Sequence, residues 1–370
     1  MANAPCPRGG KGMSAVVDLR RDGDVAVITI DNPPVNALSQ AVRAGLRDAL
    51  AKARDDAGAV AVVIACAGRT FVAGADITEF GKPPQSPGLG EVIAALEAMP
   101  KPVVAAIHGT ALGGGLELTL GCHYRVAVES AGLGLPEIKL GIIPGGGGTQ
   151  RLPRLIGMAK ALPMILSGEP IAATEANRLG LVDEIVSGDL PAGAVAFARR
   201  VAATRPLPRI RDRSDALADL RSNPQAFDDL VAANTRRARG LHAPAGAVEA
   251  LRAAFELDID DGLKKEREVF TRLVAGDQSK AQRYIFFAER EAAKVADMPR
   301  ETKARDVKAA AVIGAGTMGG GIAMCFANAG IPVTLLENSK EALDRGLGVI
   351  RRNYENTMRR GGLSQEELDR

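Results

Sequence analysis

Short apolar runs alternate with helix-like patterns along the first 200 or so residues of the chain. Two strand-like runs flank the turn signal Asp22-Gly23-Asp24, as in a β-hairpin. "SQAVRAGLRDALAKARDD" has helical spacing, with Ser39 as its expected N-cap. "AVAVVIACAG" and "KPVVAAIHG" are continuously apolar, which is typical of strands buried on both faces. Strands that alternate with helices predict an α/β fold with a largely parallel sheet.

The pattern changes after residue 205. Strand-like runs vanish, and charged helix patterns such as "AVEALRAAFELDIDDGLKKEREVFTRLVAG" predict a helical connector that packs on the first domain. "MPRETKARD" is expected to be an exposed hinge. A strand, a glycine-rich turn, a helix and a second strand then follow in "VKAAAVIGAGTMGGGIAMCFANAGIPVTLLEN". The expected divisions are a disordered Gly/Pro-rich start, an α/β domain, the connector and an incomplete βαβ unit, at 1–14, 15–205, 206–305 and 306–370.

Charge and cysteine content exclude several classes of function. The net charge of +3 gives no global electrostatic case for a nucleic-acid partner. No apolar run approaches the roughly 20 residues that span a bilayer, and the start has no hydrophobic signal core, so we expect a cytoplasmic protein without a membrane partner. The four cysteines form no CxxC pair, which disfavours a metal site or a disulfide framework. Cys122-His123 is interpreted as two ordinary residues near a strand start.

The stretch "ALGGGLELTLG", residues 111–121, places a carboxylate in an apolar run directly after three glycines. Glycines allow close approach of the backbone, and a helix N-terminus offers free N–H donors, so an anion site such as an oxyanion hole is predicted. Glu117 would lie near the first turn of this helix, and Glu137 follows 20 residues later. Two buried carboxylates are costly unless paired, hydrated or functional, and two glutamates that hold one water are a standard acid/base arrangement.

A second turn, Gly74-Ala75-Asp76, follows another buried strand and can present a further backbone N–H. Two such donors from separate loops would form a two-point oxyanion hole. The residues alone leave another interpretation open, in which the glycines only form turns and Glu117 faces solvent at a helix start.

Four segments, "GRTFVAGADI", "ALGGGLEL", "PEIKLGIIPGGGGTQRL" and "NRLGLVDEIV", resemble the enoyl-CoA hydratase/isomerase (crotonase) family in order and spacing, over about residues 16–200. "PPVNALS" and "IHGTALGGGLELTLGCHYRVA" most resemble the amino-terminal half of the bifunctional β-oxidation enzymes. Those enzymes join a hydratase to a 3-hydroxyacyl-CoA dehydrogenase. The resemblance implies the crotonase fold, a spiral of ββα units, and an acyl-CoA thioester substrate. It leaves open whether the protein is a monomer or a homo-oligomer.

The resemblance also assigns residues to roles. Ala75 and Gly114 would donate N–H bonds to the thioester oxygen, and Gly145 would line the substrate and water pocket. Glu117 would activate water, and Glu137 would deliver a proton to C2 of a 2-trans-enoyl-CoA. No cofactor is needed for that hydration. Two alternatives remain: a Δ3,Δ2-enoyl-CoA isomerase or another thioester enolate enzyme, which is disfavoured by the presence of both glutamates, and a non-catalytic scaffold.

The last segment carries a dinucleotide fingerprint. Gly314, Gly316 and Gly319 follow a buried strand and open a helix, and Glu337 ends the next strand 23 residues after Gly314. Glycines in this context allow close approach to a pyrophosphate, and the acid suits the ribose 2′-hydroxyl of NAD. "GAGTMGGGIA" and "NYENTMRRGGLS" resemble the start of a 3-hydroxyacyl-CoA dehydrogenase domain. Since only one βαβ unit is present, we expect weak or absent NAD binding and no dehydrogenase activity from these 370 residues.

Overall fold

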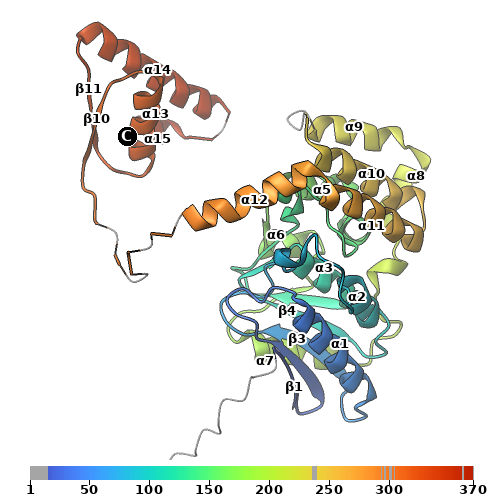
Figure 1. Cartoon of the computed structure of the whole chain (residues 1–370). Helices are drawn as coiled ribbons and strands as arrows, with labels where there is room; N and C mark the ends of the chain where they lie inside the picture. The colour runs from blue at the N-terminus through green and yellow to red at the C-terminus, as the bar shows by residue number, and fades with distance from the viewer. Residues whose placement is uncertain are drawn as a thin grey trace, which may run out of the picture. The chain divides into compact units, whose positions relative to one another are not determined.

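A computed structural model describes residues 16–235, 240–292, 294–295, 297–299, 302–303, 305–360 and 362–369. The chain divides into two compact units, Met1–Ala293 and Lys294–Arg370 (Figure 1). The start that we expected to be disordered, residues 1–14, lies outside the described residues, as do parts of the expected hinge "MPRETKARD".

A six-stranded sheet in the order β1-β2-β3-β4-β6-β9 forms the base of the first unit. Its strands are β1 Val17–Asp22, β2 Val25–Ile30, β3 Ala61–Cys66, β4 Val103–Ile107, β6 Tyr124–Ala127 and β9 Glu184–Ile185. β1 and β2 form the predicted antiparallel hairpin, and every other neighbouring pair is parallel. The largely parallel sheet predicted from the apolar runs is therefore confirmed.

Helices cover both faces of this sheet. They include α1 Gln40–Asp55, α2 Leu89–Glu97, α6 Ala173–Arg178 and α7 Leu190–Val201. In β3, Val62 and Ile64 belong to the core cluster that contains residues of α1 and α2, whereas Ala61 and Val63 pack in the cluster with α7. Alternate side chains of a strand point to opposite faces, so a strand covered on both sides has to be apolar throughout.

α1 begins where the sequence predicted, but its N-terminus is capped differently. Ser39 occupies the N-cap position, yet its side chain makes no capping hydrogen bond. Instead the Gln40 N–H donates to Glu79 Oε1 at 2.8 Å, and Glu79 Oε2 pairs with the buried Arg43 at 2.8 Å. Glu79 belongs to the short helix η1, Ile77–Glu79, so a distant segment replaces the local cap.

A three-stranded sheet brings the segments that carry the two predicted glutamates close together. It consists of β5 Thr110–Leu112, β7 Gly132–Gly134 and β8 Ile171–Ala172. β5 and β7 are parallel, with Leu112 opposite Gly134, so both strands end at the same edge. α3, Gly114–Gly121, follows β5, and the short helix η2, Pro136–Leu140, follows β7. Glu117 and Glu137 therefore start from neighbouring points of one sheet edge.

The region after residue 205 is helical, as predicted. Its elements are η3 Ile210–Asp212, η4 Asp215–Leu217, α8 Ala218–Ser222, α9 Gln225–Asn234, α10 His242–Glu256, α11 Ile259–Ala275 and α12 Asp277–Ala292. α10 packs on α4, Gly148–Ile156, and on α5, Met158–Ser167, while α11 packs on α10 and α4. Ala247, Ala250 and Leu251 of α10 join the core of the first unit, so the apolar face of the connector is buried there.

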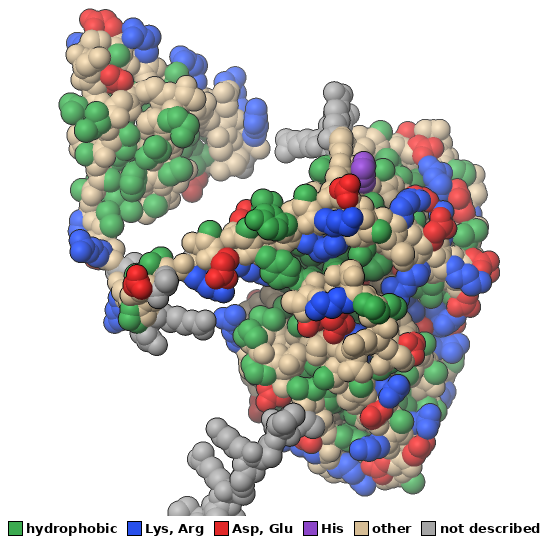
Figure 2. Space-filling view, in the orientation of Figure 1, with side chains coloured by type: hydrophobic (Ala, Val, Ile, Leu, Met, Phe, Trp, Pro, Cys, Tyr) green, Lys and Arg blue, Asp and Glu red, His purple; other side chains and the backbone are tan. Residues whose placement is uncertain are grey.

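The second unit has the predicted strand, turn, helix and strand. β10 Ala310–Ile313 pairs in parallel with β11 Val333–Leu336, and α13 Thr317–Asn328 connects them. α14 Lys340–Arg359 and α15 Gln365–Asp369 follow. Ile313, Met318 and Leu336 are exposed, and apolar side chains gather on the face of this unit that Figure 2 shows. In the described parts of both units, no helix is long and apolar enough to cross a bilayer.

Candidate active site

The structure brings Glu117 and Glu137 together at the N-terminus of α3. Glu117 lies in the first turn of α3 and is only 3% exposed. The Glu137 carboxylate lies against the residue before α3, because a Cβ added to Gly113 would come within 3.0 Å of Glu137 Oε1. Each side chain reaches the same helix end, so the interpretation that Glu117 faces solvent is wrong.

Glu117 is held by two backbone donors that sequence reasoning missed. The N–H groups of Gly146 and Gly148 donate to its Oε1 at 2.7 and 2.8 Å. Within the described residues, Oε2 has no hydrogen-bond donor. Burial raises the pKa of Glu117 above its ordinary value, while the bonds from Gly148 and Gly146 act against that rise. One oxygen is thus fixed, and the other is available to a bound molecule.

Glu137 has a backbone hydrogen bond only from its own N–H, which acts against the rise of its pKa. Its Oε2 is buried and, among the described residues, has no hydrogen-bond partner. Burial and then the negative charge of Glu117 raise the pKa of Glu137 well above its ordinary value. A buried, unpartnered carboxyl oxygen is expensive, and a protonated carboxyl beside a bound water or substrate would relieve that cost.

The two predicted oxyanion donors lie on neighbouring backbone segments. A Cβ added to Gly114 would lie 3.3 Å from the backbone nitrogen of Ala75. Gly114 opens α3 and Ala75 follows Gly74, whose φ is +128°. In the described residues, neither nitrogen donates to a backbone carbonyl outside its own element. Two backbone N–H groups without a backbone acceptor therefore lie on neighbouring segments, and their binding of a developing oxyanion stays a prediction.

The glycine-rich turn before α4 differs in detail from its predicted role. Gly145, expected to line the pocket, lies against the connector, because an added Cβ would come within 2.6 Å of the Phe270 ring. Gly145 donates to neither glutamate, whereas the following Gly146 and Gly148 hold Glu117. A lining role for Gly145 stays a prediction.

A third buried carboxylate, Glu266 of α11, accepts hydrogen bonds from the same turn. Its Oε1 accepts from the Gly147 N–H at 2.6 Å, and its Oε2 accepts from the Thr149 N–H and hydroxyl at 2.9 and 2.6 Å. Burial and the nearby Glu117 raise the pKa of Glu266. Sequence reasoning had chosen no residue from the connector.

A buried ion pair completes the support of the turn. Arg151 is paired with Glu97 through Nε and Nη2 at 2.8 and 3.0 Å, and its Nη1 donates to the Gly146 carbonyl at 3.1 Å. Gly147 has a φ of +103°, and an added Cβ would lie 1.7 Å from Arg151 Nη1. A side chain at Gly147 would therefore displace the arginine that orients its neighbour.

One signal in the sequence pointed to Glu266. The buried positions of α11 are Gly262, Glu266, Val269 and Leu273, at helical spacing. A glutamate on the apolar stripe of an amphipathic helix needs polar partners from the element it covers. No comparable signal identifies Gly146 and Gly148, because they act through their backbone N–H groups. The sequence does not show in which direction a backbone N–H points.

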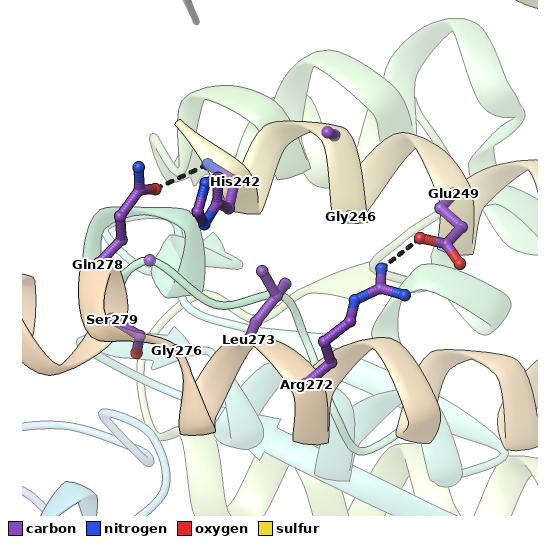
Figure 3. Close-up of a pocket in the computed structure, with 10 residues that line it drawn as sticks. His242, Gly246, Glu249, Arg272, Leu273, Gly276, Gln278 and Ser279 are labelled. Carbon is purple, nitrogen blue, oxygen red and sulfur yellow. Dashed lines mark hydrogen bonds and ion pairs between the residues drawn. The ribbon is translucent and has the colours of Figure 1, made fainter. Parts of the chain in front are cut away.

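A separate pocket lies over the connector, at the start of α10 and between α11 and α12 (Figure 3). It is lined by Gly141, His242, Glu249, Arg272, Leu273 and Gln278, among others. The Gln278 Oε1 accepts from the His242 N–H at 2.8 Å, and Arg272 pairs with Glu249. Neither Glu117 nor Glu137 lines this pocket, so it is not the candidate active site.

In the second unit, the four predicted residues meet at the turn before α13. Gly314 has a φ of +97°, and a Cβ on Gly319 would lie 1.8 Å from the Gly314 carbonyl oxygen. Gly316 is the N-cap of α13. Glu337 accepts from the Ala315 N–H at 2.7 Å, and this bond and one from Asn338 lower the pKa of Glu337. The residues present fit an adenine dinucleotide: a tight glycine turn, a helix N-terminus and an ionised acid.

Two protein families match the chain. Residues 20–218 match the family described as enoyl-CoA hydratase/isomerase, and residues 309–370 match the NAD binding domain of 3-hydroxyacyl-CoA dehydrogenase. The crotonase fold and the dinucleotide-binding βαβ unit predicted from the sequence are confirmed. The domain boundaries at residues 15, 205 and 305 remain predictions.

Curated relatives extend this likeness over most of the chain. A peroxisomal bifunctional enzyme of Danio rerio is 43% identical over 350 residues, which cover 92% of this chain and 48% of that protein. A peroxisomal fatty acid beta-oxidation multifunctional protein of Arabidopsis thaliana is 38% identical over 370 residues, covering 96% and 50%. The chain spans about half the length of these relatives. Their names state where those proteins reside; the cytoplasmic location of this chain stays a prediction.

Solved structures agree on the fold. A carnitinyl-CoA hydratase from Mycobacterium avium is similar with a TM-score of 0.56 and 32% identity, covering 75% of this chain and 97% of that one. An enoyl-CoA hydratase/isomerase from Pseudoalteromonas atlantica has the same TM-score of 0.56 at 24% identity, covering 74% and 97%. The second likeness shows the fold alone.

Proposed function

Because the chain belongs to the enoyl-CoA hydratase/isomerase family, we propose that it hydrates 2-trans-enoyl-CoA thioesters to 3-hydroxyacyl-CoA. The observation that carries this proposal is the buried carboxylate pair, in which Glu137 Oε2 has no donor among the described residues and Glu117 Oε2 is likewise free. A water between the two side chains would have a partner on each side. Isomerisation needs one acid/base group, so the second glutamate favours hydration.

The thioester carbonyl would bind between the Ala75 and Gly114 N–H groups. When water adds to C3, negative charge builds on this oxygen in an enolate-like transition state. The two segments approach closely, since a Cβ added to Gly114 would lie 3.3 Å from the Ala75 nitrogen. Both donors are backbone groups on separate packed elements, so they need no rearrangement as the charge develops.

The carboxyl groups would divide the proton transfers. Glu117, ionised and held by Gly146 and Gly148, takes a proton from the water as its oxygen bonds to C3. Glu137, kept protonated by its raised pKa, donates a proton to C2. Glu117 gains one proton and Glu137 loses one. Transfer of a proton from Glu117 to Glu137 through the next bound water then restores the starting state.

Loss of crotonyl-CoA enoyl absorbance on mixing with the purified protein tests the proposal. We expect Glu117→Gln and Glu137→Gln each to lower kcat by about 10²- to 10⁴-fold, because each loses a general acid or base. Glu169→Gln is the matched control, since Glu169 is an exposed carboxylate that pairs with Lys139 of η2 at 2.8 Å. Absence of hydration by the wild type would refute the function, and full activity in both glutamine variants would refute the residue roles.

We propose NAD as the ligand of the second unit, as part of a 3-hydroxyacyl-CoA dehydrogenase activity of a longer protein. The family match over residues 309–370 and the turn at Gly314, Gly316 and Gly319 support this ligand. The α13 N-terminus would hold the pyrophosphate, and Glu337 the ribose hydroxyls. When bound, NAD supplies a hydride acceptor.

A further inference from the structure

The turn at residues 146–149, which includes the first two residues of α4, divides its backbone N–H groups between two carboxylates. Gly146 and Gly148 donate to Glu117, whereas Gly147 and Thr149 donate to Glu266. Successive N–H groups thus point to opposite sides of the same short segment. A rotation of the segment that weakens the bonds to Glu266 also turns the Gly146 and Gly148 donors away from Glu117.

Glu266 is placed for this contact by the close approach of α11. A Cβ added to Gly262, one turn earlier, would lie 2.2 Å from Gln150 Oε1. The backbone of α11 at Gly262 therefore lies directly against the Gln150 side chain of α4. Gln150 Nε2 donates to the Thr149 hydroxyl at 2.9 Å and to the Ala250 carbonyl at 2.8 Å. Glu266 is 1% exposed, and its three accepted bonds all come from the turn.

We propose that Glu266 is a positioning residue for the hydration site: it fixes the turn at residues 146–149 so that two backbone donors hold Glu117. The inference rests on the proposed function. The hydrogen bonds of Glu266 go to Gly147 and Thr149 and not to Glu117 or Glu137, so Glu266 acts through the turn on the orientation of Glu117. The helical connector is therefore required for catalysis as well as for covering the first domain.

The kinetic test compares Glu266→Met, which keeps the volume but accepts no hydrogen bond, with Glu266→Gln, which keeps an acceptor. In Glu266→Met we expect kcat for crotonyl-CoA to fall about 100-fold, because a small displacement of a catalytic group is enough for such a loss. KM should stay within about threefold, since substrate contacts are unchanged. Glu266→Gln should recover at least about a tenth of the wild-type kcat.

Glu249→Gln is the matched control. Glu249 lies on α10 and pairs with Lys265 and Arg272 of α11, the latter pair shown in Figure 3. Its loss removes a carboxylate from the same helix pair without touching the turn, so kcat should remain within about twofold of wild type. Thr149→Val removes the hydroxyl bond to Glu266 together with the bond that this hydroxyl accepts from Gln150 Nε2, and should lower kcat about tenfold. It tests the same contact if Glu266→Met does not fold.

Hydrogen exchange supplies a readout that is independent of activity. The amides of Gly146 to Thr149 should exchange faster in Glu266→Met than in wild type, while those of the six-stranded sheet stay protected. Unchanged kcat in Glu266→Met, or a lowered kcat with unchanged exchange in the turn, would overturn the proposal. A wild type without hydratase activity would refute the proposed function instead, and the exchange measurement would still decide whether Glu266 holds the turn.

Discussion

Two carboxylates at one helix end differ because their neighbours differ. Glu117 accepts two backbone N–H bonds, which favour its ionised form, and Glu137 Oε2 accepts none within the described residues. Once Glu117 is charged, its repulsion favours the protonated form of Glu137. In the proposed mechanism this difference lets one residue type serve as the base and as the acid of the same site.

The pH dependence of hydration follows from these directions. Activity requires ionised Glu117 and protonated Glu137, so kcat should fall at low pH as Glu117 takes up a proton. It should also fall at high pH as Glu137 loses its proton. Because the pKa of Glu137 is raised well above its ordinary value, the high-pH limb should lie far above the pH at which an exposed glutamate titrates. A kcat profile for crotonyl-CoA that keeps rising with pH would contradict this assignment.

The chemistry of the site was more predictable from the sequence than its support. Glu117 and Glu137 stand out as carboxylates in apolar, glycine-rich segments, and Ala75 and Gly114 follow from the family motif. The N–H donors of Gly146 and Gly148 depend on the orientation of single peptide groups. Such orientations are set by tertiary contacts with Arg151 and Glu266, which no local pattern specifies.

Among the secondary structure elements, the apolar strands and the long helices were predicted, whereas the three strands of the small sheet were not. β3 and β4 are continuous apolar runs, and α1 has regular helical spacing, so their local signals are strong. β5, β7 and β8 have only three, three and two residues, and β7 is Gly-Leu-Gly. No periodicity can be read from so few positions; these strands form because packing aligns them beside α3 and η2.

The cap of α1 gives a prediction for an element. Ser39→Ala should change the free energy of unfolding by less than about 0.5 kcal/mol, because the Ser39 side chain makes no capping bond. Glu79→Ala should lower it by about 1–2 kcal/mol, since the Gln40 N–H loses its acceptor and the 7%-exposed Arg43 loses its carboxylate partner while it keeps its backbone acceptors. Urea titration of both variants measures the difference. A larger effect for Ser39→Ala would mean that the local residue caps the helix after all.

For the whole molecule, the two units differ in how completely they are covered. The first unit buries its sheet on both faces, and α10 and α11 close over the glycine-rich turn. The second unit has a two-stranded sheet with Ile313 85% exposed and Leu336 57% exposed. The single βαβ pattern of the sequence predicts this contrast, whereas the hydrogen bonds from residues 147 and 149 to Glu266 of the connector are evident only in the structure.

The exposed apolar surface of the second unit should lower its affinity for NAD. We expect calorimetric titration of residues 1–370 with NAD to give weak binding, because the sheet edge and apolar faces around the fingerprint remain in water. Gly319→Ala should abolish it, since the new Cβ would lie 1.8 Å from the Gly314 carbonyl oxygen. NAD should leave the hydration rate unchanged. Tight binding, or equal binding by Gly319→Ala, would contradict these expectations.

Two carboxylates, Glu117 and Glu266, accept hydrogen bonds from the turn at residues 146–149. This arrangement sets the length of chain that an engineer would have to transplant. The hydratase/isomerase match ends at residue 218, but the carboxylate that holds Gly147 and Thr149 lies at residue 266. A chimaera joined at the end of the family match would combine the turn of one parent with the helix of another. Such a graft would carry both candidate catalytic glutamates yet replace the acceptor of the Gly147 and Thr149 N–H groups, so we expect a working exchange to move the turn and α11 together.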